Sequence, residues 1–259
     1  MIFFSSLYHS LRFWIVITIL SAILGTLSVV LGFFDKSGNN SHKIAALWSR
    51  LICRWNGVSV KITGIENVLT GRPQVFVANH QGYYDIFALS GYLPVQLRWV
   101  AKASLFRVPF MGWAMGAAGY IPVARKSRKK SYQAFLNAIE SIRAGSSIVI
   151  FPEGTRSEDG KIGTFKKGGQ LLAQRAEVPM VPVTVIGTRD IIRKGSMLIH
   201  PGPVQIIVSP HVTLKGKDTK KGDEILQAIR NTIHENFEKQ LRTDAAKGQK
   251  EKRDFDKSP

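Results

Sequence analysis

The chain has 259 residues, enough for one domain of catalytic size with additional segments, and a hydrophobic content of 44% excludes a disordered chain. Lysine and arginine number 36 against 18 aspartates and glutamates, and the net charge of +18 predicts anionic partners such as nucleic acid, acidic lipid or phosphorylated substrates. The single cysteine, Cys53, excludes an intramolecular disulfide and a metal site built on several cysteines.

The N-terminal region predicts a membrane anchor. The 22 uncharged residues Phe13–Phe34 would reach roughly 33 Å as a helix, which spans a hydrocarbon core of about 30 Å. A cleaved signal peptide is disfavoured because no small-residue cleavage site follows, whereas a re-entrant hairpin stays open because Gly25 and Gly32 weaken the helix. Basic residues concentrate after this run, so the positive-inside rule places the body of the protein in the cytoplasm.

A second helix is expected directly after the anchor. Apolar residues recur at helical spacing between Ile44 and Trp55, with Lys43, Arg50 and Arg54 among them. Such a basic amphipathic helix either packs on the body or lies among lipid headgroups. Residues 1–57 are therefore assigned to a membrane anchor and this helix.

From Val58 onward the sequence alternates between apolar, β-branched runs and stretches long enough for helices. This pattern predicts an α/β fold, with a mostly parallel sheet covered by helices over residues 58–215 and an N-terminal membrane-anchoring helix or helical hairpin. The expected strands are 74–79, 99–101, 120–123, 147–151, 181–186 and 204–208, and the expected helices are 83–92, 105–117, 130–144 and 166–176.

The C-terminal region predicts one more helix and a tail. Ile225, Ile229, Ile233, Phe237 and Leu241 form a stripe at every fourth residue, which is typical of an amphipathic helix over 216–242. Residues 243–259 are charged and nearly free of large apolar side chains, so we expect a disordered tail there.

The first candidate site residue follows an expected strand. The apolar run 75–78 is followed by Asn79 and His80, and Asp85 falls five residues after the histidine, where the next helix would begin. Sites of α/β sheets form at the carboxyl ends of strands. If the loop folds back, Asp85 accepts a hydrogen bond from one ring nitrogen of His80 and leaves the other nitrogen free as a base. The competing interpretation is a surface histidine beside a helix N-terminal aspartate.

A second loop is expected at the same edge of the sheet, where the parallel strands have their carboxyl ends. The apolar run 147–150 ends in Phe-Pro-Glu-Gly-Thr-Arg-Ser, which supplies the Glu153 carboxylate, a flexible glycine at Gly154, the Thr155 hydroxyl and the Arg156 guanidinium. Arginine is the natural bidentate ligand of a phosphate. The alternative is a loop salt bridge between Glu153 and Arg156.

Together these two motifs resemble the glycerolipid acyltransferases, in particular the bacterial 1-acyl-sn-glycerol-3-phosphate acyltransferases. The Asn-His-x-x-x-x-Asp block at 79–85 and the block at 151–157 are joined by two further blocks, 119–125 and 178–183. The block at 119–125 ends in Arg125, but Ala124 stands where many family members carry aspartate. Lys102 also matches the stretch between the first two blocks. The resemblance covers roughly residues 58–212.

The resemblance implies acyl transfer without a covalent enzyme intermediate. His80 would remove the proton from the sn-2 hydroxyl of lysophosphatidic acid, 1-acylglycerol 3-phosphate. The oxygen would then attack the thioester of acyl-CoA or acyl carrier protein and give phosphatidic acid for phospholipid biosynthesis. Asp85 would orient His80. The implied substrate-binding residues are Lys102, Arg125, Glu153, Gly154, Thr155 and Arg156. No metal or redox cofactor is implied. The membrane phospholipids are expected partners, and the catalytic domain is expected on the cytoplasmic side of the cell inner membrane.

Rival functions have less support. A hydrolase with its own nucleophile lacks a G-x-S-x-G motif, and a nucleotide-driven enzyme lacks both a P-loop and a G-x-G-x-x-G motif after a strand. A nucleic-acid-binding protein is supported by the basic charge alone, so no nucleic acid is expected as a partner. Within the family, acceptors such as lyso-ornithine lipid, another lysophospholipid or glycerol 3-phosphate remain open.

Overall fold

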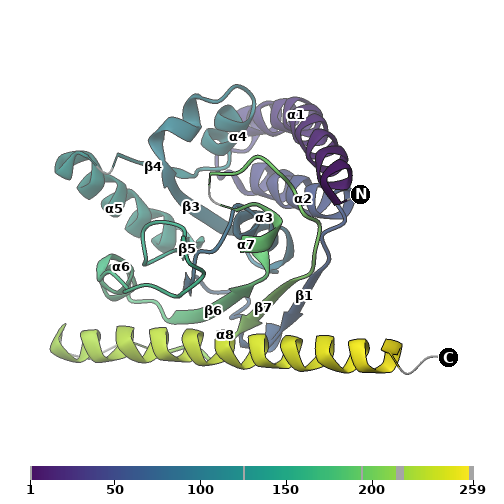
Figure 1. Cartoon of the computed structure of the whole chain (residues 1–259). Coiled ribbons are helices and arrows are strands. Elements are labelled where there is room, and N and C mark those ends of the chain that lie inside the picture. Colours follow the sequence, from purple (N-terminus) through teal and green to yellow (C-terminus); the bar gives the residue numbers. More distant parts are fainter. Residues whose placement is uncertain (1, 125, 194, 214–218, 257–259) are drawn as a thin grey trace.

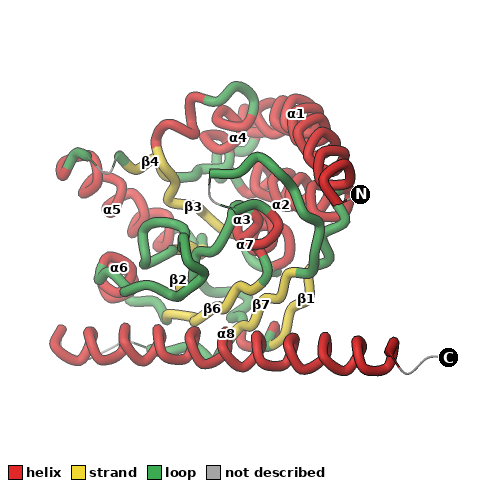
Figure 2. The backbone as a smooth tube through the Cα atoms, in the orientation of Figure 1, coloured by secondary structure: helices red, strands yellow, loops and turns green. Residues whose placement is uncertain are grey.

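The structure is a computed structural model, and it describes residues 2–124, 126–193, 195–213 and 219–256. A single seven-stranded sheet forms its centre, with helices on both faces (Figures 1 and 2). The strands are β1 (Val60–Thr63), β2 (Val75–Ala78), β3 (Leu97–Lys102), β4 (Ile121–Val123), β5 (Ser147–Ile150), β6 (Met180–Ile186) and β7 (Val204–Val208).

The strand order is β1-β7-β6-β2-β5-β3-β4, and every neighbouring pair is parallel except β6 with β7. The predicted fold class, a mostly parallel sheet covered by helices, is confirmed. All residues of β2 and of β6 are buried, as expected for central strands covered on both faces. The antiparallel pairing of β6 with β7 and the short edge strand β1 were not predicted from the sequence.

The helices form two layers. The helices are α1 (Ile2–Phe34), α2 (Asn39–Trp55), α3 (Tyr84–Tyr92), α4 (Met111–Ala117), α5 (Arg128–Arg143), α6 (Gly168–Ala176), α7 (Thr188–Ile191) and α8 (Thr219–Asp256), with 3₁₀ turns η1 (Ile65–Asn67) and η2 (Ala103–Arg107). Phe76 of β2 points into a hydrophobic core shared with α1, α2 and α3. Its neighbours Val75 and Val77 point to a second core shared with α5, α6 and α8, which follows from the two-residue repeat of a strand.

The C-terminal region corrects one prediction. Residues 243–256 do not form the expected disordered tail, because α8 continues without a break from Thr219 to Asp256 (Figure 1). The expected boundary between the central domain and this helix, at 215–216, lies outside the described residues. The predicted apolar stripe is correct: Ile229 and Ile233 are fully buried against the sheet. Intrinsic helix propensity of the charged, alanine-containing continuation explains the extension.

The apolar N-terminal helix packs on the body over most of its length. Within the described residues, the stretch Ser6–Phe34 of α1 is the one helix that is long and apolar enough to cross a membrane. The Ser10 hydroxyl accepts a hydrogen bond from the backbone N–H of Ile199 (2.9 Å). Near its other end, Gly25 lies so close to Phe110 that an added Cβ would be 3.0 Å from the Phe110 carbonyl oxygen. One side of α1 therefore belongs to the protein core, while its other side exposes large apolar residues.

Candidate active site

Two loops meet at the carboxyl edge of the sheet because β2 and β5 are neighbouring parallel strands. Val77 of β2 lies beside Ile150 of β5, so the chain leaves both strands at the same level. The β2 loop carries His80 and the β5 loop carries Glu153. A hydrogen bond from the backbone N–H of Ser157 to the carbonyl of His80 (2.9 Å) joins the two loops. The fold thus brings together two motifs that lie far apart in the sequence.

The His80 imidazole contacts the Asp85 carboxylate, as the five-residue spacing predicted. Nδ1 of His80 lies 2.6 Å from Oδ2 of Asp85, which sits in the first turn of α3. Gly82 makes the intervening turn possible, because a Cβ at this position would collide with the backbone of Thr188. The loop therefore folds back onto the helix that follows it.

Asp85 is fully buried and accepts hydrogen bonds from four groups. Besides the His80 ring, the backbone N–H groups of Gln81 (2.8 Å) and Gly82 (3.0 Å) donate to Oδ2, and the Thr188 hydroxyl donates to Oδ1. An ionised carboxylate is the form that only accepts, so this donor set suits the charged form. With Asp85 accepting from Nδ1, the network assigns the free lone pair of His80 to Nε2.

The strand end that carries His80 is fixed from the opposite side as well. The Asn79 side chain donates to the carbonyl of Val185 (2.8 Å) and accepts from the N–H of the same residue (2.7 Å). These two bonds attach the end of β2 to β6. The His80 side chain nevertheless keeps an exposed fraction of 18%, so the ring remains reachable from outside.

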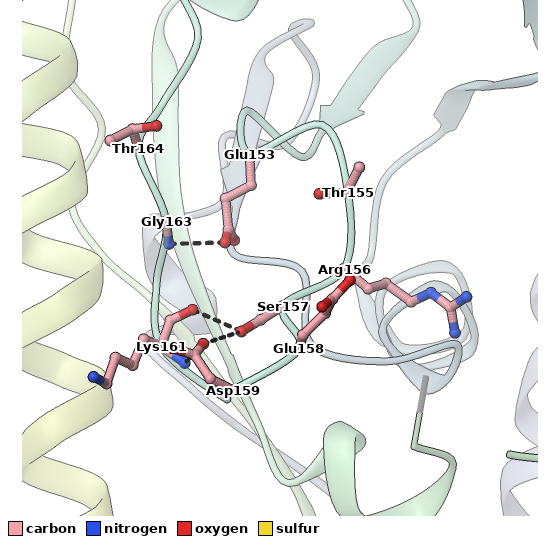
Figure 3. Close-up of a pocket in the computed structure, with 9 residues that line it drawn as sticks. All are labelled: Glu153, Thr155, Arg156, Ser157, Glu158, Asp159, Lys161, Gly163 and Thr164. Atoms are coloured by element: carbon pink, nitrogen blue, oxygen red, sulfur yellow. Dashed lines mark hydrogen bonds between the residues drawn. The ribbon is translucent and has the colours of Figure 1, made fainter. Parts of the chain in front are cut away.

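Glu153 links the two loops through both of its carboxylate oxygens. Oε1 accepts from the backbone N–H of His80 (2.8 Å), and Oε2 accepts from the backbone N–H of Gly163 (2.9 Å), as Figure 3 shows for the second bond. Burial raises the pKa of the Glu153 carboxyl above its usual value, and the two N–H groups oppose this shift. No salt bridge joins Glu153 to Arg156 in the described part of the chain, so the alternative interpretation of this motif is wrong.

Arg156 lies over an aromatic ring. Its guanidinium carbon is 3.8 Å from the centroid of the Tyr83 ring, a cation–π contact. Its Nη1 atom is buried and makes no hydrogen bond to any described residue. In Figure 3 the Arg156 side chain extends away from the turn that carries Asp159 and Lys161. The side chain is thus positioned by stacking and still has donors for an anion.

The rest of the β5 loop forms an open polar pocket. It is lined by Glu153, Thr155, Arg156, Ser157, Glu158, Asp159, Lys161, Gly163 and Thr164 (Figure 3). Gly154 has a φ of +78°, a backbone conformation that side chains with a Cβ rarely adopt. Thr155 is exposed next to it. The motif therefore turns sharply at Gly154 and presents its polar side chains at the sheet edge.

Of the two remaining predicted site residues, the structure describes Lys102 and not Arg125. Lys102 is exposed at the carboxyl end of β3, and no hydrogen bond or ion pair joins it to His80 or Arg156 where the chain is described. It does lie on the correct edge, because β3 is parallel to β5. Arg125 lies outside the described residues.

Sequence reasoning missed three residues of this site. The Thr188 hydroxyl, on the unpredicted helix α7, donates a hydrogen bond to Asp85. The Tyr83 ring stacks against the Arg156 guanidinium. Gln81 is 2% exposed, and both polar atoms of its side-chain amide are buried without a partner among the described residues. Gln81 and Tyr83 lie inside the 79–85 block and were readable as neighbours of His80, whereas nothing in the sequence marks Thr188. Within the same described ranges, no group of three histidine, cysteine, aspartate or glutamate side chains is placed to hold a metal ion.

In a comparison with protein families, residues 59–186 match the acyltransferase family. The 1-acyl-sn-glycerol-3-phosphate acyltransferase of Pseudomonas aeruginosa is 30% identical over 192 residues, which cover 73% of this chain and 72% of that protein. A chloroplastic 1-acyl-sn-glycerol-3-phosphate acyltransferase of Brassica napus is 35% identical over 198 residues, 76% of this chain. The chain spans 56% of the length of the Brassica protein and 54% of a chloroplastic relative from Arabidopsis thaliana, little more than half of each.

A solved structure is similar over nearly the whole chain. The crystal structure of the 1-acyl-sn-glycerophosphate (LPA) acyltransferase PlsC from Thermotoga maritima matches with a TM-score of 0.81 at 26% sequence identity. The match covers 93% of this chain and 98% of that chain, so it includes more than the segment that the family comparison recognises.

Proposed function

The chain belongs to the acyltransferase family that includes the 1-acyl-sn-glycerol-3-phosphate acyltransferases, and we propose that it acylates the sn-2 hydroxyl of 1-acylglycerol 3-phosphate. The acyl donor is a thioester, acyl-CoA or acyl carrier protein, and the product is phosphatidic acid. The observation that carries this proposal is the His80–Asp85 pair, with Nδ1 and Oδ2 2.6 Å apart, together with the Arg156 guanidinium, whose buried Nη1 makes no hydrogen bond to a described residue.

In this proposal His80 is the general base. Nε2 takes the proton of the sn-2 hydroxyl while the hydroxyl oxygen forms a bond to the thioester carbonyl carbon. The carbon–sulfur bond then breaks, and the imidazolium returns the proton to the departing thiolate. Asp85 stabilises the imidazolium and holds the ring, and such proton transfer contributes roughly 10²–10⁴-fold to a rate. Protons and electron pairs balance without a metal or a redox cofactor, so none is proposed.

The acceptor phosphate is assigned to Arg156, with Lys102 as a further basic residue of the same sheet edge and Arg125 as the further residue that the family resemblance implies. Stacking on Tyr83 fixes the plane of the Arg156 guanidinium, which favours a bidentate contact with phosphate oxygens. Binding at this point holds the glycerol so that its free hydroxyl faces His80. Glu153, Gly154 and Thr155 shape the loop around the acceptor.

The enzyme is proposed to act at a membrane, where its lipid acceptor resides. α4 follows the carboxyl end of β3 through η2 and packs on α1, so the edge that carries the site is connected to the apolar helix. One side of α1 is packed on the body. We therefore propose that α1 does not cross the bilayer as a separate helix, and that its exposed apolar side lies in the cytoplasmic leaflet of the inner membrane. The net charge of +18 favours contact with anionic lipids and donors.

An acceptor and donor panel tests the proposal. The purified full-length protein is incubated with acyl-CoA or acyl carrier protein and with 1-acylglycerol 3-phosphate, glycerol 3-phosphate, lyso-ornithine lipid or a lysophospholipid without a terminal phosphate. We expect thiol release and phosphatidic acid only with 1-acylglycerol 3-phosphate. Thiol release that is independent of any acceptor would instead identify a thioesterase, and transfer to another acceptor would refute the proposed substrate.

A further inference from the structure

The contacts that hold the Glu153 carboxylate in place extend to α8, which lies beyond the family-matched residues 59–186. Its carboxylate oxygens are held by the N–H groups of His80 and Gly163, so the orientation of Glu153 depends on the peptide that supplies the second N–H. That peptide, between Ile162 and Gly163, lies in the loop connecting β5 to α6. A loop peptide can rotate unless its carbonyl group is held too.

Arg230 of α8 holds both carbonyls of this loop segment. Its Nη2 donates to the carbonyl of Ile162 (3.1 Å), and its Nε donates to the carbonyl of Gly163 (2.8 Å). The Ile162 carbonyl and the Gly163 N–H belong to one peptide group. This group therefore accepts from a cation at one end and donates to the Glu153 carboxylate at the other.

A peptide group that lies between a cation and an anion donates a stronger hydrogen bond through its N–H. Hydrogen bonds in a chain polarise one another, and a charged donor on the carbonyl makes the N–H of the same peptide a better donor. Two bonds from the planar guanidinium also fix the plane of the loop, which one ammonium cannot do. Arg230 thus determines where the Gly163 N–H points.

Hydrophobic packing seats the same loop segment on the same helix. The Ile162 side chain is buried in the core that also contains Leu226, Ile229 and Ile233 of α8. Arg230 forms no salt bridge with an acidic side chain of the described residues, in which the two ion pairs are His80–Asp85 and Lys167–Asp223. The guanidinium is therefore dedicated to the two carbonyls.

From these contacts we infer that Arg230 is a positioning residue of the active site, which acts through the Ile162–Gly163 peptide on Glu153 and, through Glu153, on the backbone of His80. The inference rests on the proposed function for its kinetic consequence. It also assigns part of the active-site support to residue 230, beyond the segment 59–186 that matches the family.

The test compares Arg230→Gln with Arg242→Gln in the full-length protein. Both changes remove one arginine from α8, but Arg242 is exposed and makes no hydrogen bond among the described residues. For Arg230→Gln we expect faster hydrogen exchange of the Gly163 backbone amide and at least a roughly tenfold lower kcat/KM. The variant loses two hydrogen bonds from a charged group, and one such bond already accounts for about that factor. We expect Arg242→Gln to match the wild type in both measurements.

Two kinetic readouts separate positioning from general destabilisation. Removing Arg230 weakens a donor to Glu153, which raises the pKa of that carboxyl further, so the part of the kcat/KM profile that requires ionised Glu153 is expected to move to higher pH. In a Glu153→Gln background, Arg230→Gln is expected to add less than about a twofold loss, because the two residues act in series.

The outcomes distinguish this inference from the proposed function. Independent losses that multiply in the double variant, or exchange at Gly163 equal to that of Arg242→Gln, would overturn the positioning role. A wild-type protein without acyl transfer would refute the proposed function alone, since the exchange measurement at Gly163 needs no activity.

Discussion

Phe151 stacks face to face on the His80 imidazole, with ring centroids 4.0 Å apart and planes inclined by 10°. The aromatic ring comes from the first residue after β5, and the imidazole comes from the loop after β2. The other neighbour of Phe151 is Trp99 of β3, whose ring centroid is 5.8 Å away. The plane of the proposed base is therefore set by the Asp85 carboxylate, which accepts from the ring, and by the Phe151 ring, while Glu153 of the same loop as Phe151 holds the backbone N–H of His80.

Loss of this stacking is expected to lower turnover moderately. Phe151→Leu keeps an apolar side chain but removes the flat surface, and an aromatic pair contributes about 0.5–1.5 kcal/mol beyond its buried area. We expect kcat to fall roughly two- to tenfold with little change in KM for either substrate, whereas Phe151→Tyr stays near the wild type. Steady-state kinetics with varied acceptor and donor measure this. A change confined to KM would contradict a role in holding the base.

Removal of the base itself is expected to have a much larger effect. His80→Ala should reduce acyl transfer by about 10²–10⁴-fold, and Asp85→Asn should be similarly damaging because an amide can stabilise the wrong tautomer of the imidazole. Both variants should remain folded, as judged by circular dichroism. Activity above about a tenth of the wild type in a folded His80→Ala protein would refute the general-base role.

The acceptor phosphate is tested at Arg156. Arg156→Lys keeps the positive charge but loses the planar group that stacks on Tyr83 and forks toward phosphate. We expect a higher KM for 1-acylglycerol 3-phosphate and an unchanged KM for the acyl donor. The matched control is Lys161→Arg, a basic residue of the same loop. An effect on the donor alone would reassign Arg156 to the thioester carrier.

The exposed side of α1 is expected to contact lipid. Ile19 and Ile23 are large apolar residues that point away from the body, with exposed fractions of 50% and 61%. The double change Ile19→Asp, Ile23→Asp should leave activity on detergent-dispersed acceptor intact and strongly reduce activity on liposomes, since a charge placed in hydrocarbon costs about 2.5–3.5 kcal/mol. Tyr132→Asp, an equally exposed position on α5, serves as the control. Unchanged flotation with liposomes would exclude the proposed placement of α1.

The buried His42 side chain is expected to make the free energy of unfolding fall at acid pH. Burial lowers the pKa of this histidine to about 4, and its ring accepts from the N–H of Leu97 while the other nitrogen contacts the Tyr120 hydroxyl. The unfolded chain binds a proton near pH 6.5 and the folded chain does not, so stability present above pH 6.5 is lost as pH falls toward 4. The loss is on the order of 3 kcal/mol.

Denaturation with urea at pH 7 and pH 4.5 measures this dependence. We expect His42→Gln to be less stable than the wild type at pH 7 but to lose less free energy of unfolding between the two pH values. Parallel losses in both proteins would show that other groups cause the acid sensitivity.

The sequence predicted the elements whose signals are local. The apolar run before His80 and the run before Phe151 each form a buried strand, and five residues are enough to bring Asp85 back to the ring. The contacts between distant segments were not predictable in the same way. Thr188 reaches Asp85 across 103 residues, and Arg230 reaches Gly163 across 67, and neither residue type carries a pattern that names its partner.

The antiparallel pairing of β6 with β7 and the length of α8 were missed for other reasons. A buried strand has the same apolar pattern in either direction, so the direction depends on the connection through residues 187–203. For α8, the low hydrophobicity beyond Thr243 indicated a tail, but these residues extend a helix whose earlier turns are packed on the sheet, and extending a helix is easier than starting one.

The packing of α1 on the loop before β7 also constrains the order of events during synthesis. The Ser6 hydroxyl contacts the ring of His200, a partner 194 residues later in the chain. At about 5–20 residues per second, α1 leaves the ribosome roughly 10–40 s before this partner exists. During that interval the N-terminal part of α1 lacks this partner, and the large apolar residues on its exposed side are available to the bilayer or to a chaperone. We therefore expect α1 to be bound by a membrane or a chaperone before β7, the last strand in the chain, can complete the fold.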